Sequence, residues 1–268
     1  MRHLLLTVRN MNFGYPNKVN ILENINLSMD EGCFLGILGQ NGAGKSTLLK
    51  CINKICQFHD GDISIEDSSI QTLSLKEIAR KIAYVPQYTT AQFPTTVMNL
   101  VLMGRIPYSG YSFNKEDREF AKKSLHEMGL SSFALRDVRH LSGGERQRAF
   151  IARALAGNPK IILMDEPTSS LDIYHQLDVL SLIRNLVREK KLSVIMVIHD
   201  LNMASMFCNR VVLLKDKTIW KDGTPQDVLT EENIERVYHV KSFTSVKNGV
   251  KYIQPLDPDL WASHTHRL

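Results

Sequence analysis

The sequence lacks any apolar run long enough to cross a membrane. Its longest runs, at residues 161–164, 194–198 and 211–214, fall far short of the roughly 20 residues that a spanning helix requires. The apolar stretch near the start, at residues 4–6, is also too short for the core of a secretory signal peptide. If this protein works at a membrane, we expect it to do so through a partner.

Cysteine is scarce as well. The 4 cysteines, Cys33, Cys51, Cys56 and Cys208, form no C-x-x-C pair and have no metal-ligand spacing. This pattern argues against a cysteine-based metal site and against a disulfide framework. We interpret all of them as reduced thiols of a cytosolic protein.

A strong excess of one charge is also missing. The net charge is +5 over 268 residues, and the basic residues are scattered rather than grouped in blocks. Such a mild excess fits an anionic ligand or a position near acidic lipid headgroups, and it gives no strong indication of nucleic acid binding.

Short apolar strands alternate with helical stretches along most of the chain, whereas residues 95–158 have apolar positions at helical spacing. Strands that alternate with helices predict an α/β fold with a mostly parallel sheet, in which the helical block is an insertion. We expect turns at residues 14–17 and 60–62, helices at 46–55 and 73–81, and strands at 4–8, 21–29, 34–38, 63–65, 82–85, 161–164, 194–198 and 211–214.

A glycine-rich loop follows the strand predicted at residues 34–38. Its glycines let backbone N–H groups curl around phosphate oxygens, and the helix that follows directs its positive end at the same phosphates. Lys45 can reach the β- and γ-phosphates, and the Ser46 hydroxyl can ligate Mg²⁺. The loop matches G-x-x-x-x-G-K-[ST] and consists of Gly39, Gln40, Asn41, Gly42, Ala43, Gly44, Lys45, Ser46 and Thr47.

Two carboxylates, Asp165 and Glu166, end the strand predicted at residues 161–164. In an open α/β sheet, ligands bind at the carboxyl ends of the strands. We expect Asp165 to hold Mg²⁺ through water, and Glu166 to orient and polarise the attacking water. The alternative, a pair of solvated loop acids, is unfavourable beside a phosphate loop.

His199 and Gln87 follow two further predicted strands, at residues 194–198 and 82–85. We expect the His199 side chain to hydrogen-bond the γ-phosphate and to hold the geometry of Glu166 and its water. The Gln87 amide is expected to contact Mg²⁺ and the same water. A lone histidine is more often structural than catalytic, so its role depends on this placement.

A second possible anion site begins the helix predicted after Leu141. Ser142 is a natural N-cap, and Gly143 and Gly144 leave backbone N–H groups exposed. Because Lys45 already serves the γ-phosphate of one ATP, the simplest solution is that this segment reaches the ATP of another copy. The alternative is a well-capped helix with no ligand.

In this order, the segments resemble those of the nucleotide-binding subunits of ABC transporters. The stretch L-S-G-G-E-R-Q at residues 141–147 is the most specific part of a resemblance that covers about residues 4–240. It implies a P-loop NTPase fold with a RecA-like, mostly parallel α/β core, an antiparallel β subdomain and an inserted α-helical subdomain. It also implies ATP hydrolysis with Mg²⁺. Tyr15 looks like the aromatic residue that stacks on adenine, and Asp172 looks like the acid of a loop that bridges two subunits.

The same resemblance implies one nucleotide-binding domain over residues 1–254, with the helical subdomain at about 88–158. Residues 255–268, rich in proline and histidine, look like a loosely held tail.

The stretches at residues 73–87, 104–108 and 223–234 are similar to those of ATPases of importers for iron–siderophore, haem and cobalamin. An importer of molybdate or of another metal chelate would look much the same. The implied partners are a second copy of the chain, two polytopic permease subunits and, indirectly, a substrate-binding protein, without nucleic acid. The implied location is peripheral, on the cytoplasmic face of the cell membrane.

Residues 88–111 are expected to contact a short cytoplasmic helix of the permease. The side chains of Phe93, Ile106, Pro107 and Tyr108 suit such a surface, although they would equally suit an ordinary helical core.

Other classes of protein remain alternatives. A soluble ABC ATPase of the iron–sulfur assembly type would share every motif above. A phosphate-loop kinase or GTPase is disfavoured by the L-S-G-G stretch and by the lack of an N-K-x-D motif. A module that only binds nucleotide is disfavoured by Glu166 and His199.

Overall fold

The computed structural model describes residues 4–16, 19–87, 93–110 and 112–258. Its central sheet has the strand order β10-β9-β3-β8-β7-β6, in which β9 to β6 run parallel and β10 is an antiparallel edge strand. The expected α/β core is therefore confirmed. The strands are β3 (Phe34–Gly39), β6 (Ile82–Val85), β7 (Ile161–Asp165), β8 (Ser193–Val197), β9 (Arg210–Lys215) and β10 (Thr218–Gly223).

The register of this sheet brings several strand ends to one level. Val197 of β8 pairs with Asp165 of β7 on one side and with Ile37 of β3 on the other. The residues that follow these strands, among them Glu166 and His199, therefore meet at one edge of the sheet.

An antiparallel sheet of order β2-β1-β4-β5 forms the expected β subdomain. The turn predicted at residues 60–62 is wrong, because these residues begin β4, where Asp62 pairs with Arg9. Gly61 has φ +91, and a Cβ there would collide with the backbone of Arg9 and Asn10, so the glycine permits a close strand approach. The strands are β1 (Leu6–Phe13), β2 (Leu22–Met29), β4 (Asp60–Ile65) and β5 (Ser68–Ser69).

Alternate residues of the central strands enter two apolar cores, one on each face of the sheet. Leu163 and Ile195 pack with α1 and the antiparallel sheet, whereas Ile162 and Met196 pack with α5, α6 and α7. Every residue of β7 is buried, as expected for a parallel strand covered on both faces. The helices around it are α1 (Lys45–Ile52), α2 (Leu75–Lys81), α5 (Gly143–Ala156), α6 (Ile173–Lys190) and α7 (Leu201–Phe207).

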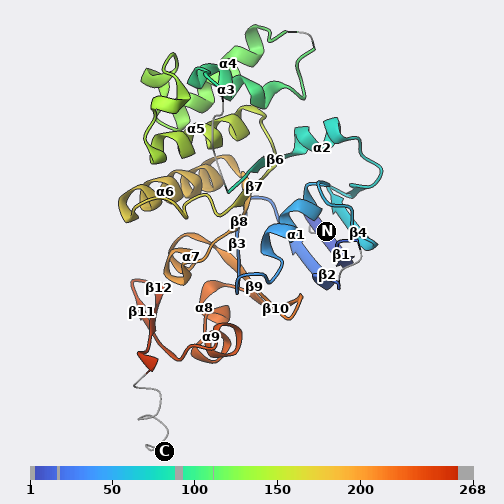
Figure 1. The fold of residues 1–268 in the computed structure, drawn as a ribbon, viewed down its shortest axis with the longest axis vertical. Helices are drawn as coiled ribbons and strands as arrows, with labels where there is room; N and C mark the ends of the chain where they lie inside the picture. Colours follow the sequence, from blue (N-terminus) through green and yellow to red (C-terminus); the bar gives the residue numbers. More distant parts are fainter. Residues whose placement is uncertain (1–3, 17–18, 88–92, 111, 259–268) are drawn as a thin grey trace, which may run out of the picture.

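The helical block and the C-terminal elements occupy opposite ends of the molecule's long axis (Figure 1). The block adds α3 (Val97–Leu102), the 3₁₀ turns η1 (Met103–Arg105), η2 (Ser131–Phe133) and η3 (Val138–His140), and α4 (Lys115–Glu127) to α5. Among the helices that the structure describes, none is long and apolar enough to span a bilayer.

The C-terminal part carries structure that the sequence pattern did not predict. It consists of α8 (Pro225–Val228), α9 (Glu231–Tyr238) and a hairpin of β11 (Ser242–Lys247) and β12 (Val250–Pro255). The Asn202 side chain of α7 bonds both the N–H and the carbonyl of Ile253, which fastens β12 to α7. Of the predicted tail, residues 259–268 lie outside the described residues.

Candidate active site

The phosphate loop joins β3 to α1 and is held in a tight curve. Gly39 has φ +144, and a Cβ there would stand 2.5 Å from the Leu214 carbonyl oxygen, so only glycine fits. The Lys45 ammonium donates hydrogen bonds to the carbonyls of Gly39 and Gln40, both at 2.8 Å. Burial lowers the pKa of Lys45, and the nearby carboxylates of Glu166 and Asp165 oppose that shift. The loop is thus curled around its own lysine.

Ser46, in the first turn of α1, meets the end of β7. Its hydroxyl donates to Asp165 Oδ1 at 2.6 Å, and the Tyr84 hydroxyl donates to Asp165 Oδ2 at 3.1 Å. Among the described residues, no group of three or more His, Cys, Asp or Glu side chains could hold a metal alone. A hydroxyl beside one carboxylate still suits Mg²⁺, which takes most of its remaining ligands from phosphates and water. The donor set therefore fits a metal that arrives with the nucleotide.

Glu166 stands just beyond β7, and its carboxylate has a partner on each oxygen. The Gln87 amide donates to Oε2 at 2.7 Å, and His199 Nε2 lies 2.5 Å from Oε1. The Glu166 backbone has φ +48, a left-handed conformation that costs energy for a residue other than glycine and is frequent at functional sites. Three strand ends that the sequence predicted separately thus meet at a single carboxylate.

A cavity of about 310 Å³ opens beside this carboxylate. Glu166 and His199 line it together with Ser169, Gln176 and Met203. His199 keeps 42% of its side chain exposed, whereas Glu166 keeps 15%. A ligand can therefore approach the pair from the solvent side.

The L-S-G-G segment begins α5, as predicted. Ser142 caps the helix, because its hydroxyl accepts from the Glu145 N–H at 3.3 Å while the Glu145 carboxylate accepts from the Ser142 N–H at 2.8 Å. No hydrogen bond or ion pair within the described part of the chain joins residues 142–144 to the phosphate loop. The predicted second anion site thus makes no such contact with the phosphate loop among the described residues.

Tyr15 and Asp172 lie at the surface. Tyr15 is 38% exposed, and its ring meets Phe13 edge-on at a centroid distance of 5.0 Å. His59 Nε2 donates to the Gly14 carbonyl at 2.9 Å and so supports the turn that carries Tyr15. Asp172 caps α6 by accepting from the His175 N–H at 2.9 Å.

The structure adds residues that the sequence did not indicate. Tyr84 interrupts an apolar strand with a hydroxyl, a signal that could have marked it as a partner of Asp165. Tyr238 gave no such signal: its hydroxyl accepts from the Gly39 N–H at 2.9 Å, and burial raises its pKa to about 12. The C-terminal helix α9 thus contacts the first residue of the phosphate loop.

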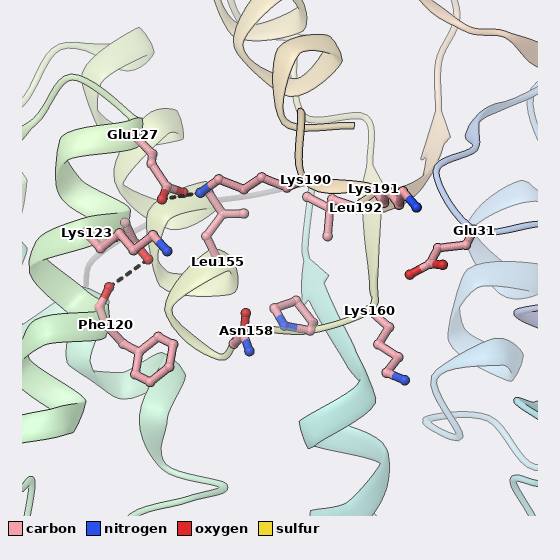
Figure 2. A pocket seen from close by; sticks show the side chains of 12 residues that line it. Glu31, Phe120, Lys123, Glu127, Leu155, Asn158, Lys160, Lys190, Lys191 and Leu192 are labelled. Carbon is pink, nitrogen blue, oxygen red and sulfur yellow. Dashed lines mark hydrogen bonds and ion pairs between the residues drawn. The ribbon is translucent and has the colours of Figure 1, made fainter. Parts of the chain in front are cut away.

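A cavity of about 240 Å³ at the amino ends of the strands is not part of this site (Figure 2). Lys190 is paired with Glu127 there, and Lys160 is paired with Glu66. The nucleotide loop lies at the opposite edge of the sheet, so we assign this cavity no part in the chemistry.

The sequence profile of the ABC transporter family matches residues 22–169. The chain belongs to the ABC transporter family. The iron(3+)-hydroxamate import ATP-binding protein FhuC of Bacillus subtilis is 39% identical to it over 237 residues, which are 88% of each chain. This ABC chain is accordingly an ATP-binding subunit that hydrolyses ATP.

Solved structures agree with this assignment of the ABC chain. A transporter described as of the metal-chelate ABC type, in an inward-facing conformation, superposes with a TM-score of 0.83 at 31% identity and covers 96% of this chain and 99% of its own. A dimeric ATP-binding cassette bound to ADP and Pi superposes with a TM-score of 0.71 at 32% identity and covers 82% and 98%. The P-loop fold that the sequence predicted is therefore confirmed.

Proposed function

We propose that this chain energises an importer of an iron chelate (siderophore or haem) or of cobalamin, from a peripheral position on the cytoplasmic face of the membrane. The observation that carries the proposal is its similarity to an iron(3+)-hydroxamate import ATP-binding protein over 88% of both chains. We propose that residues 1–254 form one nucleotide-binding domain with a helical insertion at about 88–158, and that residues 255–268 form a tail.

In this proposal two copies face each other head to tail. Each ATP lies between Lys45 of one copy and residues 142–144 of the other, with Tyr15 against adenine and Asp172 at the subunit boundary. The separation of the L-S-G-G segment from its own phosphate loop supports this arrangement, as does the dimeric cassette that the chain resembles. ATP then binds the closed dimer better than the open one, and such differential affinity drives a conformational change.

Hydrolysis in this scheme depends on Glu166. Lys45 leaves the carbonyls of its loop to bind phosphate oxygens, and the backbone N–H groups of residues 39–47 surround the same phosphates. Ser46, Asp165 and the amide oxygen of Gln87 would hold Mg²⁺, which would neutralise phosphate charge. Glu166 accepts a proton from the attacking water, and His199 orients both groups. The contacts of Gln87 and His199 with Glu166 support these roles.

We propose that the permease docks in an apolar groove of about 700 Å³. It lies between α2 and η1, and its lining includes Ile55, Leu75 and Ile106, which are 56%, 70% and 58% exposed. Tyr84 lines the groove and bonds Asp165, so the groove adjoins the nucleotide site directly. We assign it to a short amphipathic helix of the permease.

The predicted docking segment contributes only part of this groove. Ile106 and Pro107 line it, and Phe93, 77% exposed, lies outside the core, so the alternative of an ordinary helical core is wrong for Ile106 and Phe93. Tyr108 instead packs its ring against Arg105 and Arg80. Residues 88–92 and 111 of the segment lie outside the described residues.

The test is a pull-down of the tagged protein from gently solubilised membranes of its own organism, with partners identified by mass spectrometry. We expect a polytopic permease to co-purify with the wild type. Ile106→Asp should lose at least about 90% of it while ATP binding is kept, because a charge in a desolvated apolar contact costs several kcal/mol. Leu135→Asp is the matched control, since Leu135 is 86% exposed and does not line the groove.

The outcomes separate the rival functions. Capture of only soluble partners, with the protein absent from the membrane fraction, would reject the importer and leave a non-transport ABC ATPase. A permease that binds Ile106→Asp as well as the wild type would reject the groove as its docking site.

A further inference from the structure

His175 lies directly on the backbone of the L-S-G-G segment. A Cβ added to Gly144 would stand 3.0 Å from Cγ of His175 and closer still to its Cδ2. The ring of His175, in the first turn of α6, therefore fills the space that a side chain at Gly144 would need. The position of this ring fixes how closely the first turns of α5 and α6 approach.

The other side of the same ring is bonded to Asp172. His175 Nδ1 donates to Asp172 Oδ1 at 2.7 Å, and the His175 backbone N–H donates to the same oxygen. These two hydrogen bonds lower the pKa of Asp172, so the carboxylate stays ionised. Tyr174 meets the ring edge-on at a centroid distance of 5.4 Å. The imidazole is thus held from several directions.

The loop from Glu166 to Asp172 is fastened to the same turn of α6. The Gln176 amide donates to the carbonyls of Thr168 and Leu171 at 3.1 and 2.9 Å. The Leu171 side chain would lie 3.5 Å from a Cβ on Gly143. The end of this loop therefore lies beside the backbone of Gly143, and the His175 ring beside that of Gly144.

We propose that His175 is a positioning residue that couples the two nucleotide sites of the dimer. It joins the loop that follows Glu166, which serves the chain's own ATP, to residues 143–144, which serve the ATP of the other copy. Because the ring occupies the space of a Cβ at Gly144, it lies against the backbone there, and groups packed in this way move together. This inference rests on the head-to-tail dimer of the proposed function.

Two substitutions separate the hydrogen bond from the packing. His175→Asn keeps an N–H where Nδ1 stands and an atom where Cδ2 stands, so it retains both contacts. His175→Phe keeps a ring against Gly144 but loses the donor to Asp172. His126→Ala is the matched control, because His126 is exposed near the end of α4, away from the site.

The experiment measures dimer formation by light scattering in a Glu166→Gln background with Mg²⁺ and ATP. Binding of a fluorescent ATP analogue to dilute monomers and the Hill coefficient of hydrolysis in the wild-type background are measured alongside. We expect His175→Phe to raise the dimer dissociation constant about tenfold or more, as for loss of a hydrogen bond to a charged group. Its Hill coefficient should fall toward 1 while monomer affinity for the analogue stays unchanged. His175→Asn should stay within about threefold of the parent protein, and His126→Ala should match it.

A parent-like dimer constant and Hill coefficient in His175→Phe would overturn the coupling alone. The coupling would also be overturned if both His175 variants weakened the dimer equally and bound the analogue more weakly as monomers. His175 would then have only a structural role. A parent protein that binds ATP but never dimerises would overturn the proposed function, and the coupling with it. If His175→Phe does not fold, hydrogen exchange of the wild-type monomer tests the coupling instead. The coupling requires that ATP alters exchange at residues 143–147, and unchanged exchange there would overturn it.

Discussion

At the scale of single residues, Glu166 combines an unusual backbone with two strong side-chain contacts. Its φ of +48, the Gln87 amide at 2.7 Å and His199 at 2.5 Å fix the position of the carboxylate. We predict that Glu166→Gln lowers the rate of ATP hydrolysis by about 10²–10⁴, because an amide cannot accept the proton of the attacking water. ATP binding should persist, and a dimer with bound ATP should accumulate. Phosphate release and light scattering measure the two effects.

Glu235→Gln provides the matched control for that variant, because Glu235 is exposed on α9 and is not a partner of Gln87 or His199. Its hydrolysis rate should equal that of the wild type. Normal phosphate release from Glu166→Gln would contradict the role given to this carboxylate.

The candidate site residues that could be predicted from the sequence are those marked by a short local sequence pattern. The phosphate loop is contiguous, and Asp165, Glu166 and His199 follow recognisable strands, so the sheet rule brings them to one edge. Tyr238 and His175 could not be found in this way. Their contacts with Gly39 and Gly144 depend on how helices distant in sequence pack, and no short pattern records that packing.

At the scale of elements, the stretch G-R-I-P-Y has a packing role that family resemblance alone did not explain. Arg105 is 4% exposed, pairs with Asp117 at 2.9 Å and donates to the Ala156 carbonyl at 3.1 Å. Its guanidinium also stacks on the rings of Tyr108 and Phe120 at 4.0 and 4.2 Å. η1 is thereby locked to α4 and α5 beside the groove proposed for the permease.

Gly104 sets the approach of η1 to α5. A Cβ there would stand 3.0 Å from the Arg153 carbonyl carbon and closer still to its oxygen, so the two elements would have to separate. We predict that Gly104→Ala lowers the free energy of unfolding by about 1–3 kcal/mol, the usual cost of overpacking. Urea unfolding measures it. Gly110→Ala is the control, because a Cβ at Gly110 has no neighbour within 4 Å, and an equal loss in both variants would reject the close contact as the cause.

The elements that the sequence missed share a physical property. The hairpin strands β11 and β12 have one buried residue each, Ser242 and Ile253, and their other side chains are partly or fully exposed. Such strands leave no apolar alternation to detect. By contrast, β3, β7 and β8 are buried along their whole length and produce the apolar runs that predicted them.

At the scale of the whole molecule, Glu66 ties the antiparallel sheet to the central one. It follows β4, and its carboxylate pairs with Lys160, just before β7, and with Lys81 at 2.6 Å, just before β6. Hydrogen bonds from Lys160 and Lys81 lower the pKa of Glu66 below its usual 4.5. Because the pKa is lower in the folded protein than in the unfolded chain, the ionised carboxylate stabilises the fold above about pH 4.5.

Removing the charge of Glu66 tests whether its ion pairs with Lys160 and Lys81 stabilise the fold. We predict that Glu66→Gln lowers the free energy of unfolding by up to about 1 kcal/mol at pH 7, since the pairs are partly exposed. The difference from the wild type should shrink as the pH falls from about 4.5 through the lowered pKa of the folded protein, because the wild-type carboxyl then becomes neutral as well. Urea unfolding at several pH values from 3 to 7 measures it, with Glu235→Gln as the unpaired control. A difference that stayed constant across that range would mean that Glu66 acts through packing rather than through its charge.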